Sequence, residues 1–224
     1  MTAVVTGAGR GIGRAIAGAF AGAGARVALL ARTASEIEAA RASLPGGPHA
    51  AVACDVADPA QVESAAATVR ASLGSPAIVV NNAGTVTRAA FADLTVEAWR
   101  RVLAVNLDGA FLVTRAFFPD LIAHRGRIIN IASRAGREGT AYLSAYCAAK
   151  HGLVGLTRAL AEELRPDGVA AFAICPGSVD TPMLREGLPG AEPTMVPADI
   201  ANLALYLASR APFSLSGAAL DAFG

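Results

Sequence analysis

Short apolar runs alternate with helical stretches along the whole chain, and this alternation limits the possible fold more than any other feature. The runs cover residues 3–6, 26–30, 77–80, 127–131 and 169–174, with weaker ones at 49–54 and 216–221. Strands that are apolar throughout suit a parallel sheet whose two faces are both covered by helices. The sequence therefore predicts an α/β fold, a doubly wound parallel sheet with helices on both faces, in a single domain of residues 1–224.

Composition excludes several classes of protein. The chain has 224 residues, of which 54% are hydrophobic and 17% are charged, which argues against disorder. A formal net charge of +1 gives no basis for binding nucleic acid or an anionic membrane. The three cysteines lack CxxC or Cys/His spacing, so neither a disulfide framework nor a metal site is expected. We expect a soluble, cytoplasmic protein.

A glycine-rich loop follows the first apolar run, and a helical stretch follows the loop. The loop has the spacing Gly7-x-x-x-Gly11-x-Gly13, which differs from the usual GxGxxG. Glycines here permit a tight turn and let backbone N–H groups approach a diphosphate at the positive end of the helix. Such a loop can also serve only to pack a helix on a sheet. Its position directly after the first strand favours a dinucleotide site.

The second apolar run ends in residues that bear on the choice of dinucleotide. A site for NAD(H) would have an acidic residue here to bind the ribose 2′-hydroxyl, but the chain has Ala31 followed by Arg32. Arg10 lies in the glycine loop, and two guanidinium groups can grip a 2′-phosphate bidentately. The alternative is that Arg32 only begins a solvated helix. The pattern predicts NADP(H) as cofactor, in preference to NAD(H).

Tyr146 and Lys150 are the strongest candidates for catalysis. They are four residues apart in a helical stretch, so they lie on one face, one turn apart. An ammonium beside a phenol favours the phenolate and lowers the pKa of the phenol, which suits proton transfer near neutral pH. Such pairs are also common on solvated helix faces. However, Lys150 is the only lysine in a chain that otherwise uses arginine, which favours a specific need for an ammonium.

Several short motifs follow one another in an order that resembles the short-chain dehydrogenase/reductase family over essentially the full length. The matching pieces are residues 6–13, Asp55-Val56, Asn81-Asn82-Ala83-Gly84, Asn106, Ser133, Tyr146-x-x-x-Lys150 and Pro176-Gly177. The resemblance is strongest to NADP(H)-dependent members such as the 3-oxoacyl-acyl-carrier-protein reductases. It implies a Rossmann-type fold in which one domain both binds the dinucleotide and carries the catalytic residues.

The resemblance also implies a role for each matching residue. Tyr146 would donate or accept the proton at the substrate oxygen, and Lys150 would tune Tyr146 and bind the nicotinamide ribose. Ser133 would hydrogen-bond the same oxygen, and Asn106 would hold a water that links Lys150 to a proton relay. The residues expected to bind the cofactor are Gly7, Arg10, Gly11, Ile12, Gly13, Arg32, Asp55, Val56, Asn82, Ala83, Gly84, Tyr146, Lys150, Pro176, Gly177, Val179 and Thr181.

Three of these residues also have simpler interpretations, and the chain departs from the family pattern near its end. Ser133 could cap a strand, Asn106 could satisfy backbone groups of its own helix, and Thr181 could form only a turn with Pro182. Residues 183–196, rich in proline and glycine, are predicted to form a short mobile loop. A short loop is consistent with an open site for bulky or carrier-bound substrates, and equally with poor closure. The sequence ends in Leu220-Asp221-Ala222-Phe223-Gly224, where family members commonly close on Asp-Gly-Gly.

Together these features predict an NADP(H)-dependent oxidoreductase that interconverts a carbonyl and a secondary alcohol by hydride transfer. Its substrate would be a small molecule, either free or carrier-bound, and no nucleic acid or membrane is expected as a partner. The alternative is a nucleotide-binding regulator or scaffold with little or no turnover. The resemblance implies a homodimer or homotetramer, built through the helical stretches around residues 95–123 and 144–165.

Overall fold

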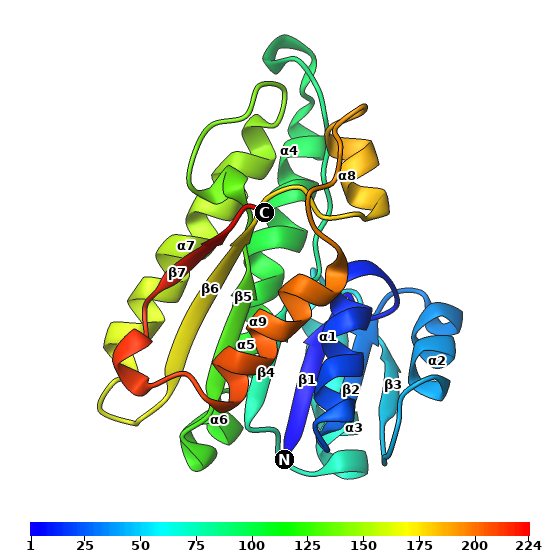
Figure 1. The fold of residues 1–224 in the computed structure, drawn as a ribbon, viewed down its shortest axis with the longest axis vertical. Coiled ribbons are helices and arrows are strands. Elements are labelled where there is room, and N and C mark those ends of the chain that lie inside the picture. Colours follow the sequence, from blue (N-terminus) through cyan, green and yellow to red (C-terminus); the bar gives the residue numbers. More distant parts are fainter.

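A seven-stranded, all-parallel sheet forms the centre of the molecule (Figure 1). The computed structural model describes all 224 residues. The strands are β1 (Thr2–Thr6), β2 (Arg26–Ala31), β3 (Ala50–Ala53), β4 (Ile78–Asn81), β5 (Arg127–Ile131), β6 (Ala170–Pro176) and β7 (Ala219–Ala222). Their order across the sheet is β3-β2-β1-β4-β5-β6-β7, and every neighbouring pair is parallel. The predicted fold class is confirmed.

Helices cover both faces of this sheet. They are α1 (Gly11–Gly22), α2 (Ala34–Ala42), α3 (Pro59–Leu73), α4 (Val96–Leu103), α5 (Gly109–Ala116), α6 (Phe118–His124), α7 (Ser144–Glu163), α8 (Pro182–Gly187) and α9 (Pro197–Ser209). Figure 1 shows α1 and α9 side by side on one face, where they pack with Val5 of β1. Val4, the preceding residue, packs on the opposite face with α3 and α5. Successive side chains of a strand point to opposite faces, so two covered faces require the uninterrupted apolar runs seen in the sequence.

Local signals fix the start of α3 as the sequence suggests. Asp58 precedes the helix, and its Oδ1 accepts hydrogen bonds from the backbone N–H groups of Ala60 at 2.9 Å and Gln61 at 3.2 Å. Pro59 occupies the first helical position, where its missing N–H has no helical partner to lose. The helix therefore begins at Pro59, shortly after β3 ends at Ala53. Asp55 and Val56 lie between these two elements, at the carboxyl edge of the sheet.

The predicted continuous helix over residues 95–123 is wrong in detail. It is divided into α4, a π-helical turn at Ala104–Asp108, α5 and α6, with a break at Phe117. A π turn inserts one extra residue into the helix, and such turns occur frequently at functional sites. Asn106 lies at the middle of this turn. The apolar pattern on either side continues through it, so the pattern did not reveal the insertion.

Two other boundaries differ from the sequence prediction. The loop predicted over residues 183–196 begins inside helix α8, which Pro182 starts and Thr181 caps by accepting a hydrogen bond from the N–H of Leu184 at 3.3 Å. The last strand begins at Ala219 and not at residue 216, because a 3-10 turn at Phe213–Leu215 and a left-handed Gly217 (φ +91°) precede it. Both differences concern the chain around the site.

No single helix is long and apolar enough to cross a membrane. One bent pair, Val96–Ala116 with Phe118–His124 at 58° to each other, passes by length and composition alone.

Candidate active site

The motif residues gather around a cavity of about 770 Å³ at the carboxyl ends of the strands. Ligands of doubly wound sheets bind at this edge. Of the residues predicted to form the site, Gly13 and Asn106 are the two that do not line the cavity; both lie directly behind its wall. We call the part of the cavity lined by Gly7, Arg10 and Arg32 its far end, and the part lined by Ser133, Tyr146 and Lys150 its near end.

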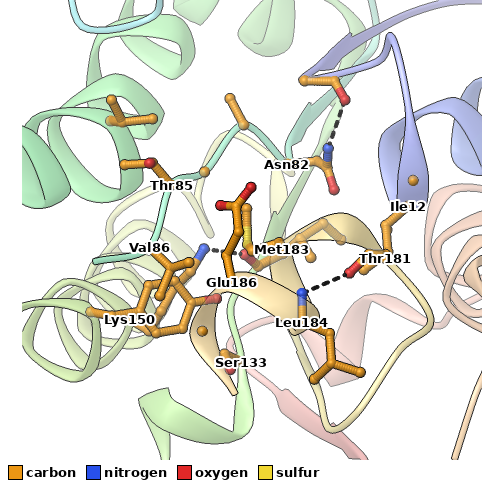
Figure 2. A pocket seen from close by; sticks show the side chains of 18 of the residues that line it. Ile12, Asn82, Thr85, Val86, Ser133, Lys150, Thr181, Met183, Leu184 and Glu186 are labelled. Carbon is orange, nitrogen blue, oxygen red and sulfur yellow. Dashed lines mark hydrogen bonds between the residues drawn. The ribbon is translucent and has the colours of Figure 1, made fainter. Parts of the chain in front are cut away.

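The glycine loop is shaped by backbone conformation and by a side chain from β4. Gly7 (φ +62°) and Gly11 (φ +55°) adopt left-handed conformations that L side chains rarely take. The amide of Asn82 donates to the carbonyl oxygens of Thr6 at 2.9 Å and Gly7 at 3.2 Å, and Figure 2 draws one of these two bonds. A Cβ on Gly13 would collide with both the Gly7 carbonyl and the Asn82 amide. Gly13 is therefore a packing residue that lets α1 begin beside the loop.

The far end of the cavity carries opposite charges. Arg10 and Arg32 are exposed there and form no ion pair within the chain. Glu36, in the first turn of α2, lines the same end. It packs closely on Gly9, because a Cβ added to Gly9 would lie 2.9 Å from the Cβ of Glu36. Sequence reasoning missed Glu36. Its position in the first turn of the helical stretch that directly follows Arg32 was the available signal.

The near end is built around Lys150, which is only 3% exposed. Its Nζ donates a hydrogen bond of 2.9 Å to the carbonyl oxygen of Ile131 at the end of β5 and lies 5.5 Å from the centroid of the Tyr146 ring. Burial disfavours the ammonium and lowers the pKa of Lys150 to about 8. A base with that pKa exchanges protons readily near neutral pH.

The pKa of Tyr146 moves in the direction opposite to the sequence prediction. Burial raises it to about 12, while the neighbouring Ser133 hydroxyl acts in the lowering direction. The phenolate loses hydration in the cavity, and this loss exceeds any attraction from Lys150, whose ammonium is bonded to Ile131. Tyr146 is therefore a protonated hydrogen-bond donor at neutral pH.

Ser133 and Asn106 each fulfil their simpler interpretation and keep a free hydrogen-bonding group. The Ser133 hydroxyl oxygen accepts from the N–H of Ala135 at 3.1 Å, and the hydroxyl hydrogen remains available to the cavity. The Asn106 amide nitrogen donates to the carbonyl oxygens of Thr85 at 2.7 Å and Val102 at 2.8 Å. Its Oδ1 is buried without a partner. A buried acceptor of this kind fits an ordered water.

A buried polar ladder lies beneath the near end and was missed at the sequence level. The Asn81 amide donates to Asn130 Oδ1 at 2.8 Å and to Thr114 Oγ1 at 2.9 Å. The Asn130 amide donates to Thr157 Oγ1 at 2.8 Å. These bonds join β4, β5, α5 and α7, so the strand that ends at Ile131 and the helix that carries Lys150 share one rigid support.

The segment after Thr181 reaches across the cavity. On α8, Gly187 packs against Val86, and a Cβ on Gly187 would lie 3.2 Å from the Val86 side chain. Met183 of the same helix packs against Gly84, where a Cβ would lie 3.5 Å from the Met183 side chain. Figure 2 shows Glu186 projecting from α8 into the cavity. The short loop therefore contacts the opposite wall, and it brings a carboxylate that the sequence analysis did not consider.

The cavity fits a dinucleotide in shape and chemistry. Its far end has backbone N–H groups of a glycine loop at the start of α1 and two free guanidinium groups. Its near end has an ammonium, two hydroxyl donors and, behind the wall, an unpartnered amide oxygen. The other residues expected to bind the cofactor line the same cavity: Asp55, Val56, Ala83, Gly84, Pro176, Gly177, Val179 and Thr181.

Comparison with known proteins supports the same assignment. Residues 1–190 match the family model of the short chain dehydrogenases. The chain is 40% identical over 232 residues to the D-threitol dehydrogenase of Mycolicibacterium smegmatis, covering 97% of this chain and 89% of that protein. A point variant of the actinorhodin polyketide ketoreductase with NADPH superposes with a TM-score of 0.93 at 32% identity, covering 100% and 95% of the two chains. The 3-ketoacyl-(acyl-carrier-protein) reductase of Brucella melitensis, complexed with NADH, gives 0.94 at 30% identity, covering 100% and 96%.

The match spans the glycine loop, the Asn82 segment, Ser133 and the Tyr146/Lys150 pair, all of which lie within residues 1–190. The reaction class follows from it: oxidoreduction of alcohol or carbonyl groups with a nicotinamide cofactor. The chain belongs to the short-chain dehydrogenase/reductase family.

Proposed function

We propose that the protein is an NADP(H)-dependent enzyme that interconverts a carbonyl and a secondary alcohol, with Tyr146 as proton donor and acceptor. The observation that carries this proposal is the placement of two hydroxyl donors, Ser133 and Tyr146, at one end of the dinucleotide cavity beside the buried Lys150. The bound cofactor supplies the hydride. The chain supplies position, hydrogen bonds and the proton.

In the direction of reduction, negative charge develops on the substrate oxygen. Ser133 and Tyr146 donate hydrogen bonds to that oxygen, which stabilises the charge. Tyr146 then transfers its proton to the oxygen, and a pKa raised to about 12 keeps this proton on the phenol until the oxygen becomes basic. Lys150 can return a proton to Tyr146, because its own pKa of about 8 permits exchange near neutral pH. A water on Asn106 Oδ1 would connect Lys150 to solvent.

The preference for NADP(H) over NAD(H) rests on the far end of the cavity. Arg10 and Arg32 offer two free guanidinium groups for a 2′-phosphate. Glu36 opposes this preference, because its carboxylate lines the same end. Related structures contain NADPH in one case and NADH in another. We propose NADP(H) because two cations outweigh one anion, and we expect the preference to be modest.

The substrate side favours an uncharged molecule that carries hydroxyl groups. Glu186 projects into the cavity, where its carboxylate accepts hydrogen bonds and repels anions. Arg185 on α8 is the basic residue of this segment that could meet an acidic carrier protein, and it forms an ion pair with Asp180 at 2.7 Å. Relatives act on a polyol in one case and on ketoacyl groups in others. We therefore propose a small hydroxylated ketone or its alcohol ahead of a carrier-bound thioester.

We also propose a homodimer or homotetramer that uses α4, α5 and α7. Phe111 on α5 is 47% exposed, and a large apolar side chain exposed on one of these helices fits an interface between copies. Sedimentation at micromolar concentration would test this assembly, with Phe111→Glu expected to shift the protein towards the monomer.

The test of the function is oxidation of NADPH, with NADH alongside, against hydroxylated ketones, simple ketones, aldehydes and 3-oxoacyl thioesters. Turnover that prefers NADPH and is lost in Tyr146→Phe supports the proposal. Tight NADPH binding with no turnover on any carbonyl would instead indicate a nucleotide-binding regulator or scaffold. Turnover that survives in Tyr146→Phe would overturn the role of Tyr146.

A further inference from the structure

The last six residues of the sequence, the terminal segment 219–224, lie across the base of the near end of the cavity. Strand β7 runs parallel to β6, with Ala222 opposite Pro176 (Figure 1). The N–H of Gly177 donates to the carbonyl oxygen of Ala222 at 2.7 Å. The terminal segment therefore borders directly on the Pro176–Gly177 turn that lines the cavity.

Two arginines from the loop that follows Ser133 hold this segment. In this catalytic loop, residues 133–138, the Arg134 guanidinium carbon lies 5.0 Å from the centroid of the Phe223 ring. Arg134 Nε is buried without a hydrogen bond and lies 3.8 Å from Glu138 Oε1, so the Phe223 ring and the Glu138 carboxylate are both neighbours of this guanidinium. The Nε of Arg137 lies 2.9 Å from Asp221 Oδ1, in a half-exposed ion pair.

The contact between the catalytic loop and the terminal segment closes around Gly177. A Cβ at this position would lie 2.7 Å from an Arg134 terminal nitrogen and 2.9 Å from the Phe223 carbonyl oxygen. The three elements are therefore in tight contact, and a shift of one must move the others. A second cavity, of about 460 Å³, lies on the other side of this contact. Phe223 lines this second cavity and does not line the dinucleotide cavity.

The opposite side of the terminal segment holds the lid, residues 182–196. Thr194 Oγ1 donates to the carbonyl oxygen of Phe223 at 3.0 Å, and the N–H of Thr194 donates to Ser178 at 3.0 Å. Met195 follows and forms an isolated parallel bridge with Val179. The returning half of the lid is thus fixed between the terminal segment and the chain that leaves β6.

We propose that Asp221 and Phe223 are positioning residues. They hold the catalytic loop and the lid in fixed positions relative to each other, so that both contact the substrate. The proposal rests on the proposed function for its kinetic consequence, but its structural consequence stands alone. Neither side chain lines the dinucleotide cavity, so the Phe223 ring acts through Arg134 and the Asp221 carboxylate through Arg137, while the backbone carbonyl of Phe223 holds Thr194 of the lid. Substrate turnover depends on the side-chain contacts of Asp221 and Phe223. The Gly177 turn, which is assigned to the cofactor, is held by its backbone bond to Ala222, so substitution of these side chains should leave cofactor affinity unchanged.

The test combines four variants and one control with measurements of kcat/KM, NADPH affinity and hydrogen exchange. Phe223→Ala removes the ring, and Phe223→Tyr retains a ring face for Arg134. Asp221→Arg breaks the ion pair, and the double variant Asp221→Arg/Arg137→Asp restores it with reversed charges. Phe213→Ala is the matched control, because Phe213 is 38% exposed and Phe223 is 36% exposed, and Phe213 lies in the turn before β7.

We expect Phe223→Ala and Asp221→Arg each to lower kcat/KM for the carbonyl about tenfold, because this is the scale of a lost cation–π contact or of a lost half-buried hydrogen bond between charged groups. The affinity for NADPH should not change. Hydrogen exchange at the amides of Gly136 and Arg137, which bond within the loop at 2.8 Å, should accelerate in both variants. Phe223→Tyr and the charge-reversed double variant should restore both readouts, and Phe213→Ala should change neither.

Exchange rates in residues 133–138 that stay at the wild-type value in Phe223→Ala and Asp221→Arg would overturn the proposal. So would a charge-reversed variant no better than Asp221→Arg. If the wild-type protein shows no turnover, the proposed function fails while the exchange measurement still decides whether the terminal segment holds the loop.

Discussion

The two ends of the cavity are built in different ways. At the near end, Lys150 and Asn106 are buried, each with defined hydrogen-bond partners, and the ladder through Asn130 supports the strand beneath them. At the far end, Arg10 and Arg32 are exposed and have no ion-pair partner. Buried groups with fixed partners are preorganised, which is what catalysis of a proton transfer needs. Exposed charges adapt to what binds, so they set cofactor preference by a difference in affinity.

This contrast predicts that substitutions at the near end change rate, whereas substitutions at the far end change the choice of cofactor. Tyr146→Phe is the sharpest example, because it removes the transferable proton and keeps the ring. We expect kcat to fall about 10³-fold, within the range for a lost general acid, with unchanged NADPH affinity. Initial rates and cofactor titration would measure both. A Tyr146→Phe enzyme whose loss lies mainly in NADPH binding would contradict the division between the two ends.

Lys150→Met should lower kcat about 10²-fold, a typical effect of losing one group of a proton relay. Its effect on stability has a sign that depends on pH. The pKa of Lys150 falls from 10.5 to about 8 on folding, so the unfolded chain binds more protons between these values. The wild type should therefore gain stability relative to Lys150→Met as pH rises from 8 to 10.5. Denaturant unfolding at several pH values would show it; a wild type that loses stability relative to Lys150→Met over this range would exclude a buried, neutralised lysine.

The same pKa predicts the pH dependence of turnover. If the Lys150 ammonium supplies protons during reduction, kcat/KM for NADPH should fall above a pH of about 8, because this parameter reports groups of the free enzyme. The fall approaches about tenfold per pH unit for one required proton. Tyr146, with a pKa near 12, stays protonated across this range. A profile that is flat between pH 7 and pH 10 would contradict this assignment.

At the far end, the double variant Arg10→Ala/Arg32→Ala should lose preference for NADPH. A hydrogen bond to a charged group contributes about 1.5–3 kcal/mol, so the ratio of kcat/KM for NADPH over NADH should fall at least about tenfold, with kcat for NADH unchanged. Arg14→Ala is a matched control, because Arg14 is exposed on α1 but lies outside the cavity, bonded to Ser43. An unchanged ratio would remove the argument for NADP(H).

Glu36→Gln should have the smallest effect and the opposite sign. It removes a negative charge beside the position assigned to the 2′-phosphate, so kcat/KM for NADPH should rise a few-fold, as expected for an exposed charge pair worth about 1 kcal/mol. The effect should weaken as salt is added, since exposed charges are screened. A Glu36→Gln variant whose kcat/KM falls for NADH and does not rise for NADPH would place Glu36 on the ribose hydroxyl, contrary to the account.

Features that depend on local sequence could be predicted, and features that depend on how elements meet could not. Apolar runs fixed the strand positions to within a few residues, and the i, i+4 spacing of Tyr146 and Lys150 put both on one helix face. Whether Glu36 and Glu186 face the cavity depends on how α2 and α8 pack against distant loops. The direction of the Tyr146 pKa was also missed, because the desolvation that raises it arises from several elements that converge on α7, around a side chain that is itself partly exposed.

The central claim is that the near end delivers a proton to an oxygen whose carbon receives hydride. The most direct measurement uses NADPH deuterated at the transferable position, an uncharged hydroxylated ketone, and mass analysis of the alcohol formed. The account predicts deuterium on the carbinol carbon with the wild type and almost none with Tyr146→Phe. Wild-type protein that binds NADPH yet transfers no deuterium to any carbonyl tested would contradict it.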